Sequence, residues 1–96
     1  MEIKWNKVAV KQLLQAIEYL EENELFDYAQ KIENTILFKV RALSENADIY
    51  QLDRLKKNND GTYKALEVDR YRISFRRLDK EIRILRIRHT ARKPVR

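Results

Sequence analysis

The residue types that could do chemistry gather near the end of the chain. Residues 71–76 read Tyr-Arg-Ile-Ser-Phe-Arg, and residues 86–93 read Arg-Ile-Arg-His-Thr-Ala-Arg-Lys. Arginine is preferred where planar hydrogen bonds to phosphate are made, and histidine can give or take a proton near neutral pH. The single histidine, His89, lies inside the second arginine run. The pattern therefore indicates a phosphate-binding surface with one candidate general acid or base.

Alternation along the strands decides which of these side chains could share a surface. Arg72 and Arg76 alternate with apolar residues, so both should project from one face of a strand, away from the helices. If the following strand pairs in register, Arg86 and Arg88 could join the same patch. A solvated or ion-paired surface is the plainer interpretation for Arg76, and a structural or simply exposed histidine is the plainer one for His89.

Composition excludes several classes of site. The 96 residues suffice for a single domain, 1–96, and include no cysteine, one histidine, one glycine and one proline. Disulfides, thiolate or multi-histidine metal sites, a cysteine nucleophile and a glycine-rich phosphate loop are therefore excluded. We expect neither a metal nor a cofactor. No apolar run reaches membrane length and no signal-peptide pattern opens the chain, so we expect a cytoplasmic protein without a membrane partner.

The net charge of +6 hides an uneven distribution. Residues 1–53 hold 6 basic and 10 acidic side chains, whereas residues 54–96 hold 15 basic and 5 acidic ones. A half this basic attracts phosphates or an acidic partner over long distances. Its few carboxylates, such as Glu67, either pair with neighbouring arginines or, as a sharper hypothesis, supply a general base for a ribose hydroxyl.

Helical periodicity marks the first half of the chain. Asn6 is a suitable N-cap, and apolar residues recur at helical spacing over 10–20 and again over 25–43. The break between the two runs is short, which favours an antiparallel helical hairpin. Residues 1–5 form a candidate leading strand. The connector over 44–63 is long, so we interpret it as either a docked loop or a functional one.

The second half changes to the alternation of β-strands. Candidate strands cover 65–68, 71–76 and 82–89, and their short connections predict an antiparallel meander. Residues 82–89 are apolar on both parities, which predicts a central strand buried on both faces. The helical hairpin must bury its apolar stripe against this sheet, which gives an α+β fold in the order β-α-α-β-β-β. The basic tail, 91–96, is expected to be flexible.

This order of elements and three sequence stretches resemble the RelE/ParE superfamily of bacterial toxins from type II toxin–antitoxin modules. The first stretch is Trp-Asn-Lys at 5–7 with the helix that follows, and the second is the arginine-containing strand at 71–76. The third, 82–92, contains Ile-x-Ile-Leu and ends in His-x-x-Arg. The resemblance covers nearly the whole chain. It implies a short strand and an antiparallel helical hairpin packed on a small antiparallel sheet.

RelE-like members of this superfamily cut messenger RNA on the ribosome without a metal and so inhibit translation. The resemblance implies that Arg72, His89 and Arg92 are catalytic, orienting the phosphate and stabilising its charge while the neighbouring 2′-hydroxyl attacks. The other basic side chains near the strand ends are expected to bind RNA: Arg76, Arg86, Arg88 and Lys93. We take this endoribonuclease, with the ribosome and mRNA as partners, as the first hypothesis.

ParE-like members instead bind DNA gyrase and do no chemistry of their own. The segment after His89 contains no tyrosine, which departs from the nuclease pattern, and the long helical hairpin also supports this alternative. Both branches imply a cognate antitoxin that wraps the toxin, and the basic half of the chain would suit an acidic antitoxin segment. A third hypothesis is a non-toxic member that only pairs with its antitoxin.

Overall fold

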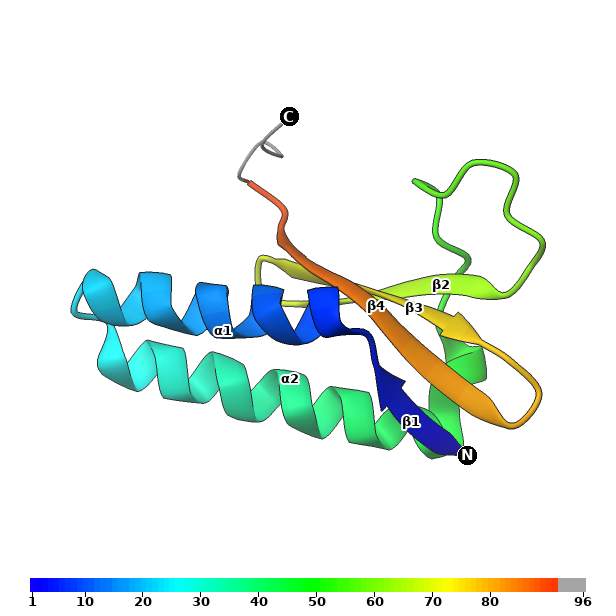
Figure 1. Cartoon of the computed structure of the whole chain (residues 1–96), viewed down its shortest axis with the longest axis horizontal. Helices are drawn as coiled ribbons and strands as arrows, with labels where there is room; N and C mark the ends of the chain where they lie inside the picture. The colour runs from blue at the N-terminus through cyan, green and yellow to red at the C-terminus, as the bar shows by residue number, and fades with distance from the viewer. Residues whose placement is uncertain (92–96) are drawn as a thin grey trace.

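The computed structural model describes residues 1–91 and contains two long helices and four strands (Figure 1). In chain order the elements are β1 (Glu2–Trp5), α1 (Lys7–Glu22), α2 (Phe26–Asn46), a 3₁₀ turn η1 (Ala47–Ile49), β2 (Tyr63–Val68), β3 (Tyr71–Arg77) and β4 (Glu81–His89). The α+β fold and the order β-α-α-β-β-β predicted from the sequence are confirmed.

The strands lie side by side in the order β1-β4-β3-β2. β2, β3 and β4 form the predicted antiparallel meander, with Glu67 opposite Arg72 and Arg72 opposite Arg88. β1 pairs with β4 in parallel, Ile3 lying opposite Ile82, so the whole sheet is mixed rather than purely antiparallel. Alternation within a strand carries no information on its direction, which is why the sequence did not reveal this pairing.

Local chemistry starts α1 where the sequence predicts it. The Asn6 side chain accepts a hydrogen bond from the Val8 amide at 2.8 Å, which satisfies one of the free amides of the first turn. The two helices run antiparallel beside each other (Figure 1) and bury residues three and four apart: Ala9, Leu13, Ala16 and Leu20 in α1, and Ala29, Ile32, Ile36, Val40 and Leu43 in α2. No helix within residues 1–91 is both long and apolar enough to span a membrane.

A β-bulge at Leu85 corrects one prediction. Consecutive residues of β3 lie opposite Ile84 and Arg86, so Leu85 is an extra residue in β4. The extra residue shifts the alternation and places both Ile84 and Ile87 in the core. The prediction of a strand buried on both faces was wrong, because the bulge explains the apolar residues of both parities. Arg86 and Arg88 remain exposed on the outer face.

The core makes a first prediction. The Phe75 ring is fully buried (0% exposed), so Phe75→Ala should lower the free energy of unfolding by about 3–5 kcal/mol through lost burial and a residual cavity. Phe38 on α2 is 66% exposed, which makes Phe38→Ala the matched control, expected to change stability little. Urea denaturation followed by circular dichroism measures both variants, and similar losses for the two would contradict this core.

Candidate functional site

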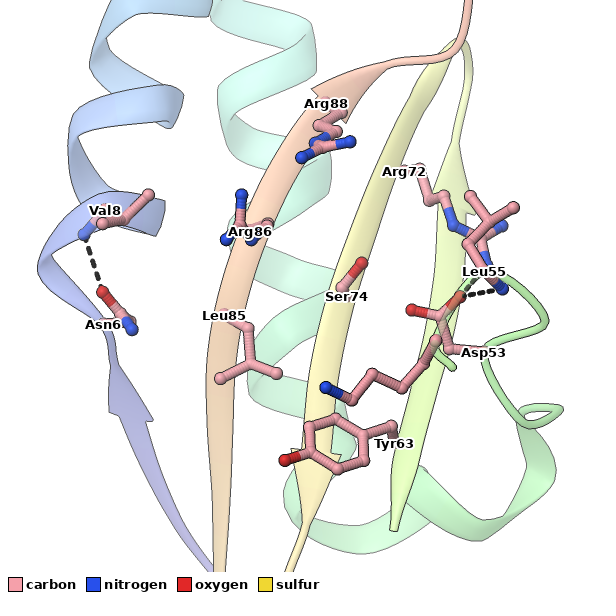
Figure 2. Close-up of a pocket in the computed structure, with 11 residues that line it drawn as sticks. Asn6, Val8, Asp53, Leu55, Tyr63, Arg72, Ser74, Leu85, Arg86 and Arg88 are labelled. Carbon is pink, nitrogen blue, oxygen red and sulfur yellow. Dashed lines mark hydrogen bonds and ion pairs between the residues drawn. The ribbon is translucent and has the colours of Figure 1, made fainter. Parts of the chain in front are cut away.

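The outer face of the sheet, away from the helices, carries a groove of about 420 Å³ (Figure 2). β3 and β4 form its floor, the start of α1 forms one wall, and the loop between η1 and β2 forms the other. Its lining combines basic, acidic and apolar side chains, among them Asp53, Leu55, Lys56, Tyr63, Arg72, Leu85, Arg86 and Arg88.

Two carboxylates hold Arg72, the arginine that the sequence places first among the site residues. Its Nη2 donates a hydrogen bond to Asp53 Oδ1 at 2.6 Å (Figure 2), and its Nη1 lies 3.6 Å from Glu67 Oε1. The Arg72 and Asp53 side chains are only 14% and 10% exposed. The charge of Arg72 is therefore compensated within the chain. Glu67 takes the ion-pairing role that the sequence offered as its plainer interpretation.

Asp53 is held as a carboxylate. Burial by itself raises the pKa of Asp53, because desolvation disfavours the charged form. The hydrogen bond from Arg72 and a second one from the Leu55 amide, 3.0 Å from Oδ1, outweigh burial and keep the pKa of Asp53 below its ordinary value. The same carboxylate thus pairs with the strand arginine and fixes the first turn of the loop.

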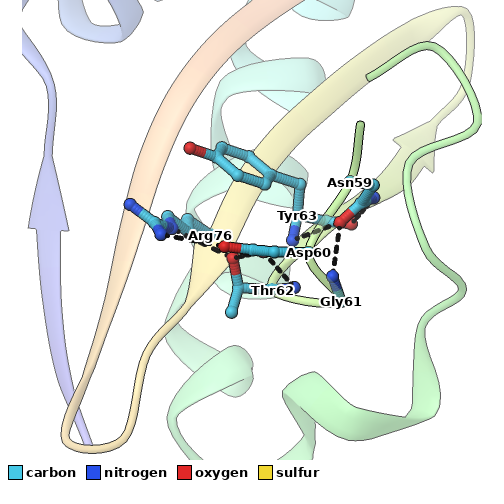
Figure 3. Close-up of polar contacts among 6 residues, drawn as sticks. All are labelled: Asn59, Asp60, Gly61, Thr62, Tyr63 and Arg76. Atoms are coloured by element: carbon cyan, nitrogen blue, oxygen red, sulfur yellow. Dashed lines mark hydrogen bonds and ion pairs between the residues drawn. The ribbon is translucent and has the colours of Figure 1, made fainter. Parts of the chain in front are cut away.

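The rest of the loop is held by its own polar groups (Figure 3). Asn59 Nδ2 donates to the carbonyl oxygens of Asp53 at 3.3 Å and Tyr63 at 2.8 Å, and Asn59 Oδ1 accepts from the Gly61 amide at 2.9 Å. Gly61 has φ of 96°, a left-handed conformation that glycine adopts without strain. Of the two interpretations of the long connector, the docked loop describes this arrangement.

Arg76 also projects from the outer face but is engaged by the loop. Its Nε donates to Thr62 Oγ1 at 3.0 Å, and its Nη2 lies 3.3 Å from Asp60 Oδ2 (Figure 3). The guanidinium carbon lies 4.8 Å from the centre of the Tyr63 ring. These contacts match the ion-paired alternative that the sequence offered for Arg76.

Three basic side chains of the groove carry an open charge, meaning one that no acidic side chain of residues 1–91 neutralises. Arg86, Arg88 and Lys56 are exposed, and none of them forms an ion pair within residues 1–91. Lys56 Nζ lies 4.6 Å from the centre of the Tyr63 ring, a cation–π contact that leaves its charge available. Exposed Leu55 lies in the same groove. The groove therefore offers positive charge beside an apolar contact.

His89 lies on the other face of the sheet. Its ring packs edge-on against Tyr71 with the ring centres 5.1 Å apart, in a small pocket of about 160 Å³ that Gln12 of α1 also lines. Its Nδ1 accepts a hydrogen bond from the Ala91 amide at 3.2 Å. Successive strand residues point to opposite faces, so the structure does not bring His89 together with Arg72.

The remaining predicted site residues, Arg92 and Lys93, lie outside the described part of the chain. The flexible tail predicted for 91–96 lies outside it too, apart from Ala91, which is exposed. Across residues 1–91, no group of three or more histidine, cysteine, aspartate or glutamate side chains is placed to hold a metal ion.

Comparison with known proteins supplies the family. Residues 3–94 match the family described as ParE toxin of type II toxin-antitoxin system, parDE. The chain belongs to the ParE toxin family. Membership makes it the toxin component of a type II toxin–antitoxin system and implies a cognate antitoxin as partner. A search of curated proteins gave no match for this toxin.

A solved structure supports the architecture independently. The chain described as the chromosomal ParDE TA system from P. aeruginosa superimposes with a TM-score of 0.75 at 24% sequence identity. The match covers 93% of this ParE-family toxin and 95% of that chain. At this identity the likeness shows the fold alone, and it confirms the predicted RelE/ParE-like fold.

Sequence reasoning missed the residues of this toxin that position the arginines. Asp53 stands between Leu52 and Arg54, just before the strongly basic half, which is a weak signal of a specific role. Nothing in the sequence linked it to Arg72, because the intervening loop determines how the two approach. Lys56 was also missed, since an exposed lysine in a loop looks like any other solvated charge.

The buried ion pair makes a second prediction. Asp53→Asn keeps the acceptor for the Leu55 amide but removes the charge facing Arg72, so it should lower the free energy of unfolding at neutral pH by about 3 kcal/mol. The matched control is Asp48→Asn, because Asp48 also pairs with a β3 arginine, Arg77, at 2.9 Å but is 72% exposed. That variant should lose less than about 1 kcal/mol.

The sign of the pH dependence follows from the lowered pKa of Asp53. A carboxyl whose pKa is lower in the folded state contributes its full stabilisation above the pKa of an unfolded aspartate, and the contribution disappears as the pH falls through the folded-state pKa. The difference between wild type and Asp53→Asn should therefore be constant near neutrality and shrink below about pH 4. Urea titrations from pH 7 to pH 3 measure it, and a difference that grows on acidification would contradict the pair.

Proposed function

We propose that this ParE-family toxin acts by binding DNA gyrase and poisoning it, without chemistry of its own, and that its antitoxin neutralises it. One observation carries the proposal: Arg72 is bound by Asp53 and Glu67, while His89 lies on the opposite face of the sheet. Gyrase and the antitoxin act in the bacterial cytoplasm, so the proposed site of action is the cytoplasm.

The chemistry of RNA cleavage explains why this observation matters. Metal-free cleavage needs a group that moves a proton and a cation that stabilises the phosphate, and both must reach one phosphate within about 3 Å of the reacting atoms. In this chain, the candidate proton carrier, His89, and the strand arginine, Arg72, serve different faces of the sheet. A ligand on either face meets only one of them, which favours a binding role.

The groove suits the antitoxin better than it suits a catalytic substrate. Arg86, Arg88 and Lys56 provide open positive charge, and Leu55 provides an apolar contact beside them. An extended or helical segment with carboxylates on one side and an apolar side chain between them would be complementary to this surface. We propose that an acidic segment of the antitoxin occupies the groove.

Ribosome-dependent cleavage of mRNA is the second candidate function. The observation that favours it is the same pair of open arginines, Arg86 and Arg88, because guanidinium groups also bind backbone phosphates. On this alternative the ribosome would have to supply or rearrange the catalytic groups that residues 1–91 do not bring together on this face. Arg92 and Lys93 would extend its RNA-binding surface, as the resemblance implies.

Two assays on the purified toxin separate the candidates and make a third prediction. In a plasmid supercoiling reaction with DNA gyrase, we expect the toxin to inhibit supercoiling in a concentration-dependent way. In a bacterial cell-free translation reaction with the same toxin concentration, primer extension should show intact mRNA. New 5′ ends that appear only on translated mRNA, with normal supercoiling, would overturn the proposal, and inactivity in both assays would favour the non-toxic hypothesis.

The groove makes a fourth prediction about the antitoxin. Reversing both open arginines, in the variant Arg86→Glu with Arg88→Glu, should weaken binding of the cognate antitoxin by at least about tenfold, because both charges face the proposed acidic segment. Isothermal titration calorimetry measures the affinity. The matched control is Lys39→Glu with Arg41→Glu, the same charge change at exposed positions of α2, which should leave the affinity within about threefold. Equal losses in both variants would show general electrostatic attraction instead.

A further inference from the structure

The charges on α1 run against the dipole of the helix. Helices favour acidic side chains near their start and basic ones near their end. α1 has no acidic residue in its first turn and no basic residue in its last turn. Lys7 and Lys11 lie in its first half instead, and Glu18, Glu21 and Glu22 lie in its second. This arrangement costs the isolated helix stability, whereas a second helix with the opposite order of charges would stabilise it.

These charges also lack ion-pair partners in the described part of the chain. Lys7 and Lys11 are one turn apart and repel each other, as do Glu18 and Glu22, because residues four apart are neighbours on a helix. Across residues 1–91 none of these side chains forms an ion pair. Their positive and negative ends are therefore both available to another molecule.

An exposed apolar centre separates the two charged ends. Positions 7, 11, 14, 18 and 21 follow one another in steps of four and three residues, so they form a single stripe along α1. Leu14, the middle position, is 60% exposed, and neighbouring Val10 is 41% exposed. The stripe therefore reads positive, positive, apolar, negative, negative along the exposed side of the helix.

We propose that two copies of this chain associate through this stripe as an antiparallel, two-fold symmetric pair. Reversing the stripe on itself places Leu14 against Leu14 of the second copy. The same operation places Lys11 against Glu18 and Lys7 against Glu21, twice each. A two-fold axis requires a surface that complements itself, and this stripe meets that requirement at every position. The reversed helix also sets its dipole antiparallel to that of α1.

A second copy of the chain fits this surface because the stripe is complementary to itself, so no other protein is needed as the partner. Val10, one turn before Leu14 on α1, adds exposed apolar area to the same surface. The area of one helical stripe is below that of the usual stable interface, so we expect dissociation in the micromolar range. None of the stripe residues lines the groove, so association does not depend on the proposed function.

Exchange of the charges tests the pairing directly. Sedimentation equilibrium of the wild-type chain should show reversible association from the 11.7-kDa monomer to twice that mass. Lys7→Glu with Lys11→Glu makes all four charged positions of the stripe acidic. Glu18→Lys with Glu21→Lys makes all four of them basic. Each variant alone should be monomeric with an unchanged circular dichroism spectrum, and an equimolar mixture of the two should associate again. A monomeric wild type, or a mixture that fails to associate, would overturn the proposal.

A cysteine at the two-fold axis gives a second test that does not disturb the charges. The chain contains no cysteine, so Leu14→Cys introduces a single thiol, and two such thiols would meet across the axis. We expect this variant to form a disulfide-linked dimer under mild oxidation. Gln15→Cys is the matched control, because residue 15 is exposed but points about 100° away around the helix. Equal crosslinking of the two variants would contradict the proposed axis.

Discussion

The ion pair between Asp53 and Arg72 is the interaction on which the outer face of this toxin depends. It joins the loop after η1 to the start of β3, and the loop in turn forms one wall of the groove. Burying two charges costs desolvation free energy that their attraction barely offsets. The value of the pair therefore lies in fixing one loop conformation. Because the ion pair also neutralises the charge of Arg72, Arg86 and Arg88 are the arginines of the groove that remain available to a ligand.

The sheet divides the molecule into two surfaces, for which we propose different uses. The outer surface carries the groove with its open cations, and the helical surface carries α1 with its opposed charges and exposed Leu14. The bulge at Leu85 contributes to this division, because it keeps Ile87 in the core while Arg86 and Arg88 stay outside. The two proposed recognition surfaces are therefore separate from each other, and both would suit large partners.

Much of the architecture could be predicted because it follows from local patterns. The Asn6 cap, the helical hairpin and the meander each rest on spacing within a few residues, and the structure confirms them. The face of Arg72 was predictable for the same reason. The partners of Arg72 were not, because Asp53 is 19 positions away and reaches it only through a loop. The bulge could not be predicted either, because one extra residue in a strand shifts the alternation and gives the same apolar pattern as a strand buried on both faces.

We propose that Arg72 anchors the loop and takes no part in chemistry. The most direct measurement is growth arrest after induction of the double variant Asp53→Asn with Arg72→Met, in bacteria that lack the antitoxin. This pair removes both charges together, fills the same space and keeps the acceptor for the Leu55 amide. We predict a folded variant that still arrests growth. A variant that folds like the wild type but no longer arrests growth would contradict the account.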